Sequence, residues 1–446
     1  MSSRFAISSA RVITPQGMRP AAVIVAGEQI EAVVERDAVP PGVPCEDLGE
    51  LVLMPGLVDC HVHVNQPGRT HWEGFDTATR AAAAGGVTSL VDMPLNCLPV
   101  TTSVAGFDAK LADCRSNLWI DVGYWGGVVP GNLEELAGLA DRGVLGCKAF
   151  LCDSGIPEFP ASDEPTLRQA MRALAKAGIP LLAHAELELD GPPPDPKLDH
   201  HDYQAWLHSR PAAWEEAAIA LLIRLCRETG CAVHIVHLSA ASAIPLLRAA
   251  RAEGLPITVE TCPHYLCLCA EEVPTSATVY KCAPPVREAD NREGLWAGLR
   301  EGVIDLVVTD HSPCTPELKG DGDFIAAWGG IASLSLGLAS VWTSAKARNI
   351  ELTQVVEWMS AGPARMTGLA QKGALRPGCD ADLVAFDPEA TFTVTAEHLH
   401  FRHKLSPWIG RSLSGQVRRT WLRGRPIYAA PDSFTGPHGR PLLRHP

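Results

Sequence analysis

The 446-residue sequence lacks the features that mark several large classes of protein. No run of about 18 uninterrupted apolar residues occurs, so we expect no transmembrane helix and no membrane partner. Residues 1–7 do not form the apolar core of a signal peptide. No basic run occurs and the formal net charge is −13, which disfavours binding to nucleic acid or an anionic membrane. These absences favour a cytoplasmic protein that acts on a small molecule.

Several familiar motifs are also missing. The 14 cysteines are scattered and form no Cys-x-x-Cys pair, so we expect reduced, mostly buried thiols rather than disulfides. The absence of a Gly-x-Ser-x-Gly sequence argues against a serine nucleophile. No Gly-x-Gly-x-x-Gly turn follows an apolar strand, which disfavours a dinucleotide-binding open sheet.

From residue 51 onward, continuous apolar segments of strand length alternate with helical segments. Parallel strands that are buried on both faces have this character. Eight such units over about 300 residues predict a (β/α)8 TIM barrel, with a doubly wound open sheet as the alternative. The eight expected strands are the one that contains His61 and the segments 87–93, 118–125, 144–151, 179–185, 231–238, 257–262 and 304–309.

The two ends of the chain follow a different pattern. Short strands and turns fill residues 1–53 and return after residue 366. We expect residues 1–53 and 367–446 to combine into one small β-sandwich domain, with a barrel of residues 54–366 inserted between them. The last ~15 residues are rich in proline, glycine and histidine, and we expect them to be loosely held.

Side chains that can bind a metal stand at the ends of the predicted strands. His61 and His63 are two residues apart, so a strand places both imidazoles on one face. This pair alone is a weak motif, because two ordinary polar residues at a strand end would look the same. In a barrel, however, the carboxyl ends of all strands meet at one mouth. The other residues of this kind at strand ends are Lys148, His184, His237 and Asp310.

The chemistry of this set predicts a metal centre. Imidazoles and a carboxylate suit zinc, with cobalt, manganese or iron as neighbouring choices. An ordinary lysine would repel two divalent ions, so we expect Lys148 to be carboxylated by CO2 and to bridge them as an anion. The alternative is a salt-bridged or solvent-reaching lysine. We expect Asp310 to bind metal and to move a proton from the attacking water to the departing nitrogen.

Three further histidines lie near this mouth. His234 precedes His237 by three residues and so falls on the opposite face of a strand, which favours a packing role. His264 and His311 are either supporting partners or ordinary loop residues.

Eight longer sequence segments narrow the choice of protein family. They are PGRTHWEGF (67–75), MPLN (93–96), GCKAFL (146–151), SGIPEFP (154–160), ETCPHY (260–265), DHSPC (310–314), AWGGI (327–331) and PGCDADLV (377–384). With these segments the chain resembles, over nearly its whole length, the amidohydrolase superfamily in its cyclic-amidase branch of dihydroorotases, hydantoinases and allantoinases. Within that branch it is most similar to the allantoinases, which hydrolyse a ring amide of allantoin to give allantoate in purine catabolism.

The resemblance implies several properties of the chain. It implies a homotetramer and a binuclear metal centre held by His61, His63, carboxylated Lys148, His184, His237 and Asp310. It also implies a substrate-binding set made of Asn65, Asn96, Ser154, Ala283 and Gly329. Two departures bear on the fit of the substrate. Gln66 stands where the family usually has glutamate, and Ala283 replaces the usual cysteine or serine of a Lys-Cys-x-Pro-Pro segment.

Asn65 also bears on the substrate. Dihydroorotases that resemble this chain have an arginine two residues beyond the His-x-His pair, where a guanidinium binds the substrate carboxylate in a bidentate fork. Asn65 cannot neutralise an anion, so we expect an uncharged ring with amide and urea edges, such as allantoin. Asn65 could instead serve only to turn the loop before Pro67.

Two other functions stay open at this point. One is hydrolysis of another cyclic amide, as in hydantoinases, dihydropyrimidinases or dihydroorotases. The other is a non-enzymatic scaffold, a role taken by relatives that have lost their metal ligands. The second is disfavoured because the complete ligand set is present.

Overall fold

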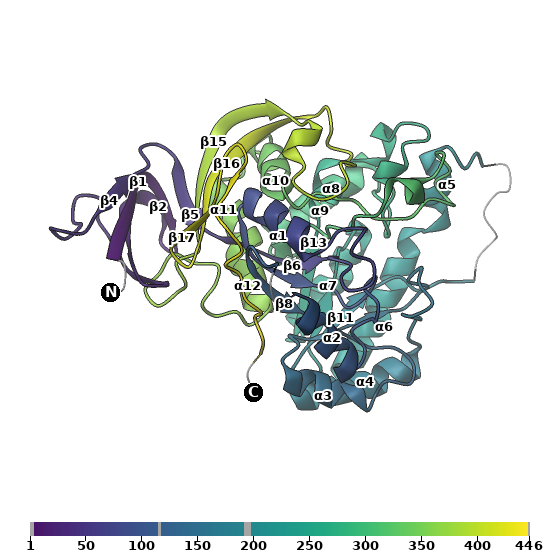
Figure 1. Ribbon diagram of the computed structural model, residues 1–446. Coiled ribbons are helices and arrows are strands. Elements are labelled where there is room, and N and C mark those ends of the chain that lie inside the picture. Colours follow the sequence, from purple (N-terminus) through teal and green to yellow (C-terminus); the bar gives the residue numbers. More distant parts are fainter. Residues whose placement is uncertain (1–3, 115–116, 191–197, 445–446) are drawn as a thin grey trace.

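The computed structural model describes residues 4–114, 117–190 and 198–444. Figure 1 shows a group of N-terminal strands at one side of the molecule and a larger body of strands and helices at the other. The C-terminal strands lie between these two parts (Figure 1).

The strands of the larger body are short, parallel and buried. They are β6 (Leu57–Val62), β7 (Val87–Asp92), β8 (Asp121–Tyr124), β9 (Gly126–Gly127), β10 (Cys147–Phe150), β11 (Leu181–His184), β12 (Val233–Ile235), β13 (Ile257–Thr261) and β14 (Leu306–Val307). Only Trp125 separates β8 from β9, so these two are parts of one strand. Strands pair in sequence order, and a parallel bridge between Val62 and His311 brings the last segment beside the first. The expected (β/α)8 barrel is confirmed.

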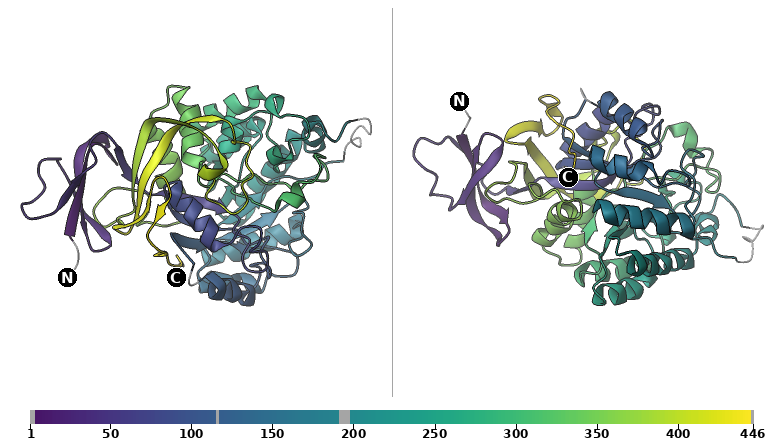
Figure 2. Two further views of the ribbon diagram at one scale, coloured as in Figure 1. Left: turned by 45° about the horizontal axis from the view of Figure 1, so that its top comes forward. Right: turned by 90° about the horizontal axis from the view of Figure 1, so that it is seen from below.

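Helices cover the outside of this barrel (Figure 2). They are α1 (Phe75–Ala84), α2 (Val104–Cys114), α3 (Glu135–Arg142), α4 (Glu164–Ala177), α5 (Tyr203–Ser209), α6 (Ala212–Thr229), α7 (Ile244–Ala252), α8 (Pro263–Cys267), α9 (Ala289–Arg300), α10 (Gly337–Lys346), α11 (Leu352–Val356) and α12 (Gly362–Met366). No helix in the described ranges is long and apolar enough to cross a membrane.

Helix α4 illustrates how the sequence sets these elements. The Asp163 side chain accepts a hydrogen bond from the Thr166 N–H at 2.9 Å, which caps the first turn. Gly178 ends the helix with a φ of 66°, a left-handed conformation that glycine adopts at little cost. The buried face of α4, which includes Leu167, Met171 and Leu174, belongs to the core between helices and strands. Helix and strand periodicity therefore direct one apolar layer inward.

Both ends of the chain contribute to one nine-stranded sheet. Its strands are β1 (Arg4–Thr14), β2 (Gly17–Ala26), β3 (Gln29–Val34), β4 (Cys45–Asp47), β5 (Val52–Pro55), β15 (Leu383–Thr393), β16 (Ser412–Leu422), β17 (Arg425–Ala429) and β18 (Ser433–Phe434). The two halves join where β5 and β15 pair antiparallel, with Met54 opposite Val384. A separate apolar core, which includes Val23, Leu53 and Leu383, lies in this sheet region.

The expectation of a loosely held C-terminal segment is wrong for the residues that the structure describes. The Val122 N–H of β8 donates to the Arg440 carbonyl at 3.1 Å, and the Leu442 N–H donates back to the Val122 carbonyl at 2.8 Å. Further along, the Arg444 N–H donates to the Gly143 carbonyl at 2.9 Å. These backbone bonds hold the segment against the barrel, which composition alone did not reveal because backbone groups of any residue can pair in this way.

Candidate metal centre and active site

The ligand-type side chains predicted from strand ends meet at one place. They are His61 in β6, His63 just beyond it, Lys148 in β10, His184 at the end of β11, His237 beyond β12 and Asp310 beyond β14. All of them line one cavity of about 340 Å³. None is more than 7% exposed. The structure therefore brings the whole set together at the carboxyl ends of the barrel strands.

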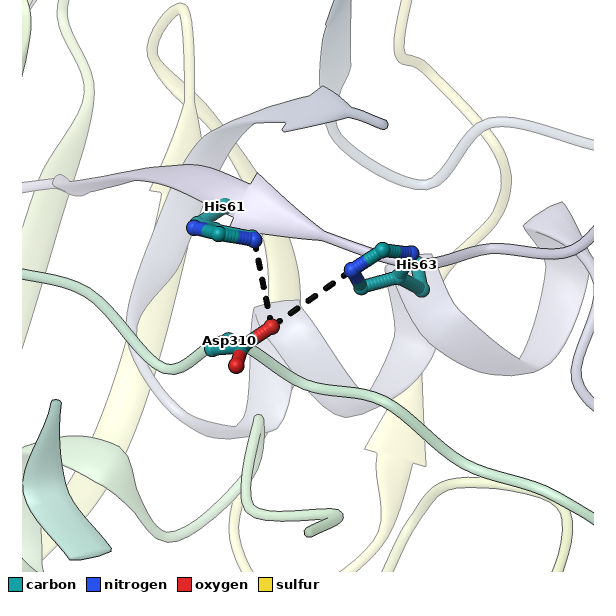
Figure 3. A group of neighbouring side chains, drawn as sticks. All are labelled: His61, His63 and Asp310. Carbon is teal, nitrogen blue, oxygen red and sulfur yellow. Dashed lines mark ion pairs between the residues drawn. The ribbon is translucent and has the colours of Figure 1, made fainter. Parts of the chain in front are cut away.

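Two of the imidazoles lie beside the carboxylate of Asp310, and the other two lie beside each other. His61 Nε2 lies 3.2 Å and His63 Nε2 lies 3.5 Å from Asp310 Oδ1, and both rings face that carboxylate (Figure 3). His184 Nδ1 lies 2.9 Å from His237 Nε2. The ring centroids of His61 and His237 are 5.3 Å apart, which links the two pairs.

Two of these residues have an uncommon backbone conformation. His237 has a φ of 39° and Asp310 a φ of 44°. A non-glycine residue pays about 1–3 kcal/mol for a sparsely populated backbone conformation, and such residues concentrate at functional sites. Here the conformation places both side chains at the cavity.

Buried atoms without a hydrogen bond show what the centre could hold. Among the described residues, these atoms include His61 Nε2, His237 Nδ1 and Lys148 Nζ. One ligand atom each from His61, His63 and Asp310 lies within 4.8 Å of the others. Buried imidazole nitrogen atoms that lack hydrogen bonds and converge with a carboxylate suit a divalent ion. The donor set therefore fits a metal centre.

The protonation states also suit metal binding. Burial lowers the pKa of His63 to about 4 and lowers the pKa of His184 and of His237, so these imidazoles are neutral at pH 7. Burial opposes ionisation of Asp310, but the surrounding histidines lower its pKa well below the usual range. Neutral imidazole and ionised carboxylate are the forms that coordinate metals.

Lys148 is an unusual member of this set. Its side chain is fully buried, and its Nζ has no hydrogen-bond partner among the described residues. Burial lowers the pKa of Lys148 to about 8. A substantial fraction of the amine is therefore neutral near pH 7–8, and the neutral amine is the form that reacts with CO2.

Glu260 is a supporting residue that the sequence analysis did not assign. It lies in β13 and is fully buried. Its carboxylate contacts His61 Nδ1, accepts from His234 Nε2 at 2.9 Å and accepts from the His237 N–H at 3.1 Å. Such a carboxylate fixes the orientation and tautomer of a metal-binding histidine. The available signal was an acidic residue at the end of the seventh predicted strand.

His234 has more than a packing role. Its ring joins Glu260 to the Thr258 hydroxyl, which lies 2.8 Å from His234 Nδ1. The prediction counted the strand alternation through to His237, but β12 ends at Ile235 and the chain then turns to a positive φ. Strand parity therefore does not relate His234 to His237, although His234 does lie outside the lining of the cavity, as expected.

Glu186 contacts His184, another histidine of the predicted metal-binding set. Its carboxylate lies 2.7 Å from His184 Nε2 and 2.5 Å from an Arg210 guanidinium nitrogen. Burial would raise the pKa of Glu186, but Arg210 and His184 lower it, so the carboxylate is ionised. The His184 ring also stacks on Phe150 at 4.4 Å between centroids. Glu186 follows His184 by two residues in the sequence, which was the available signal.

His311 and His264 have different environments. His311 Nδ1 accepts from the Ser333 N–H at 3.2 Å, and its carbonyl accepts from the His63 N–H at 2.8 Å, so it supports the centre through the backbone. His264 is fully buried, and neither ring nitrogen has a hydrogen-bond partner in the described part of the chain. Burial lowers its pKa to about 4.

The residues expected to contact the substrate divide into two groups. Asn96, Ser154, Ala283 and Gly329 line the same cavity as the metal-type residues. Asn65 is buried but is not among the lining residues, and its amide donates to the Pro313 carbonyl at 3.2 Å. Asn65 also has a φ of 65°, which fits the alternative in which it turns the loop.

The two departures from the family pattern also differ in position. Gln66 lies outside the cavity lining, where its amide donates to Asp113 at 2.7 Å and accepts from the Phe75 N–H at 2.9 Å. Gln66 therefore anchors its loop to the start of α1 and to the last turn of α2. Ala283 lies in the cavity wall, so only this departure faces the substrate space.

Comparison with known proteins shows the family to which the chain belongs. Residues 52–427 match the model of the amidohydrolase family, and the chain belongs to that family. Members of this family depend on metal, which agrees with the clustered histidine and aspartate side chains. The L-hydantoinase (dihydropyrimidinase) from Arthrobacter aurescens has a similar structure, with a TM-score of 0.92, 28% identity and all of both chains covered. The dihydropyrimidinase from Brevibacillus agri has a TM-score of 0.86 at 27% identity, with 99% of each chain covered.

Three relatives with higher sequence identity are named allantoinases. The allantoinase of Streptomyces avermitilis is 52% identical over 441 residues, which are 99% of this chain and 98% of the relative. The allantoinase of Arabidopsis thaliana is 45% identical, with 95% of this chain and 87% of the relative covered. The allantoinase of Saccharomyces cerevisiae is 46% identical, with 89% and 87% covered.

Proposed function

We propose that this protein is an allantoinase, a hydrolase that opens the hydantoin ring of allantoin at a ring amide to give allantoate. The observation that carries the proposal is 39–52% identity to curated allantoinases, against 28% or less for the solved hydantoinase and dihydropyrimidinase structures compared above.

The proposal includes the metal centre. His61, His63, His184, His237 and Asp310 would hold two divalent ions, most simply zinc, and Lys148 would bridge them as a carbamate. The unpartnered Lys148 Nζ and its lowered pKa support the carbamate, in which the amine adds to CO2 and releases a proton. When bound, the ions would supply Lewis-acid activation of the ring carbonyl and of the attacking water.

The chain's own residues would do the remaining work. Asp310 would take a proton from the water through its carboxylate and return it to the ring nitrogen as the C–N bond breaks. Glu260 would keep His61 in one orientation, and Glu186 would do the same for His184. Asn96, Ser154, Ala283 and Gly329 would bind the amide and urea edges of the ring, since all of them line the cavity.

The quaternary structure and location belong to the same proposal. We expect a homotetramer, which light scattering coupled to size-exclusion chromatography would measure. The 14 cysteines are all free, which suits the reducing environment of the cytoplasm.

The activity is tested with purified, metal-loaded protein. Colorimetric assay of allantoate should show turnover of allantoin, and elemental analysis should find up to two divalent ions per chain. Absence of allantoin hydrolysis at full metal loading would overturn the proposal.

A further inference from the structure

Two buried lysines hold the loop that forms the outer wall of the cavity. Residues 325–330 all line the cavity. Lys281 Nζ donates to the Ile325 carbonyl at 3.0 Å and to the Ala327 carbonyl at 2.5 Å. Lys319 Nζ donates to the Trp328 carbonyl at 3.0 Å and to the Gly330 carbonyl at 2.7 Å. We call this pair of lysines with the four carbonyls the lysine clamp.

The clamp consists of charged groups in an unusual environment. Lys281 is only 4% exposed and Lys319 only 8% exposed. In the described ranges, neither ammonium has a carboxylate within ion-pair distance, so each relies on backbone carbonyls. Lys281 also lies 4.0 Å from the centroid of the Trp206 ring. Burying a cation without a counterion destabilises a protein, so packing alone does not account for lysine at these positions.

Backbone hydrogen bonds hold the same loop from the same side. The Trp328 N–H donates to the Leu318 carbonyl at 2.8 Å, and the Gly330 N–H donates to the Lys281 carbonyl at 2.8 Å. Thus the carbonyl of Lys281 and the carbonyl of Leu318, the residue before Lys319, each accept a backbone hydrogen bond from the loop. Together these contacts fix the residues on both sides of Gly329.

Gly329 is left with its peptide groups available. Among the described residues, its N–H and C=O have no hydrogen-bond partner. A Cβ at this position would meet only the Cα of Cys282, at 4.0 Å, so the space beside Gly329 is open. The loop therefore presents one donor and one acceptor from Gly329 at the cavity, while its neighbouring carbonyls face the lysines.

We propose that Lys281 and Lys319 are positioning residues that fix the 325–330 loop so that the peptide groups of Gly329 meet the amide and urea edge of the substrate. The identity of that substrate rests on the proposed allantoinase function. The lysines act through the loop and do not take part in bond breaking.

The test compares Lys281→Met and Lys319→Met with Lys404→Met. Methionine keeps most of the apolar stem and removes the ammonium. Lys404 also donates only to backbone carbonyls, those of Leu399 and Phe401, but these residues do not line the cavity. Lys404 is exposed, unlike the two clamp lysines, so Lys404→Met controls only for the loss of a lysine–carbonyl contact elsewhere in the chain.

Two measurements follow. Each clamp variant should raise the KM for allantoin by about tenfold, as expected when fixed polar groups lose their alignment, with a smaller change in kcat and unchanged metal content. Amide hydrogen exchange should become faster in residues 323–331 and stay unchanged in the barrel strands. The double variant should raise KM by less than the product of the single effects, because both lysines hold one loop. Lys404→Met should match the wild type.

Two outcomes would overturn the proposal. One is an unchanged KM with unchanged exchange in 323–331 for both clamp variants. The other is faster exchange throughout the barrel, which would show a general stabilising role. Lys281 and Lys319 lie on different segments of the chain. If one variant does not fold, the other variant therefore still tests the proposal. If the wild type fails to hydrolyse allantoin, the proposed function fails, while the exchange comparison still decides whether the clamp exists.

Discussion

Two buried clusters of titratable side chains lie toward opposite ends of the barrel strands. One is the metal-type set at the carboxyl ends. The other surrounds Asp121, the first residue of β8, together with Asp380, Asp382, Lys372 and Arg423. Lys372 Nζ lies 2.7 Å from Asp121 and 2.8 Å from each of the other two aspartates. Both clusters contain enough ligand atoms for a metal, so composition does not separate them.

Charge balance and hydrogen bonding do separate them. In the second cluster every carboxylate is ion-paired: Lys372 lies within ion-pair distance of all three aspartates, and Arg423 also pairs with Asp121. Burial opposes the charge of Lys372, but the three aspartates raise its pKa. In the metal-type set, His61 Nε2, His237 Nδ1 and Lys148 Nζ have no hydrogen-bond partner among the described residues, although His61 Nε2 lies within ion-pair distance of Asp310. A cluster whose carboxylates are all paired with cations acts as a joint, here between the barrel and the C-terminal strands, whereas a cluster with unpartnered ligand atoms can bind a metal or another ligand.

The largest effect on activity is expected from His61→Ala. Removal of this side chain should reduce allantoin hydrolysis to near background and lower the metal content, with the circular dichroism spectrum unchanged. Glu260→Gln is the graded comparison, because loss of a supporting carboxylate typically costs about 10–100-fold in metal affinity or activity. Activity of His61→Ala equal to that of the metal-loaded wild type would contradict the assignment.

Lys148→Ala should also lose metal and activity, because the bridging anion is removed. A short carboxylic acid such as formate or acetate should restore part of both, since it can occupy the position of the carbamate. Mass spectrometry or crystallography of the wild type should show the added carboxyl group on Lys148. An unmodified Lys148 amine in fully metal-loaded, active protein would refute this role.

Asp310→Asn should reduce kcat by about 10²–10⁴-fold, the usual cost of removing a positioned acid–base group. The comparison is made on protein whose metal content equals that of the wild type, so that loss of the proton carrier is separated from loss of a ligand. Near-normal turnover in such metal-loaded protein would rule out proton transfer by Asp310.

Lys372→Met should have the smallest effect on catalysis and a large effect on stability. It leaves three buried aspartates with fewer cations, and breaking a buried ion pair typically costs about 3–5 kcal/mol. Thermal or urea unfolding should show this loss, while kcat and KM for allantoin in the folded fraction stay within about twofold of wild type because the cluster is remote from the cavity. A specific loss of kcat without loss of stability would show that the two clusters are functionally coupled.

The sequence predicted the barrel and the convergence of the metal-type residues because both follow from simple periodicities. Buried parallel strands are continuously apolar, and a barrel places all their carboxyl ends together. The contacts that orient the histidines could not be predicted from these periodicities. Glu260 reaches His61 and His234 through the relative register of β6, β12 and β13, which a single sequence does not reveal. The face of His234 relative to His237 was assigned by strand parity, although the strand ends before His237.

Irregular segments account for the remaining differences. The Lys281 and Lys319 contacts are made with an irregular loop, for which no hydrophobic period predicts the position of a carbonyl. The segment that ends at Arg444 is held by backbone hydrogen bonds, so its composition of proline, glycine and histidine was a poor guide. Tertiary pairing decided both cases.

We expect a neutral hydantoin with a ureido group to be the preferred substrate. The most direct measurement compares kcat/KM for allantoin, dihydroorotate, dihydrouracil and simple 5-substituted hydantoins at one concentration range and one metal loading. We expect allantoin to exceed each of the others by tenfold or more, which corresponds to about 1.4 kcal/mol of transition-state discrimination. A kcat/KM for dihydroorotate or dihydrouracil tenfold above that for allantoin, again about 1.4 kcal/mol, would contradict the account.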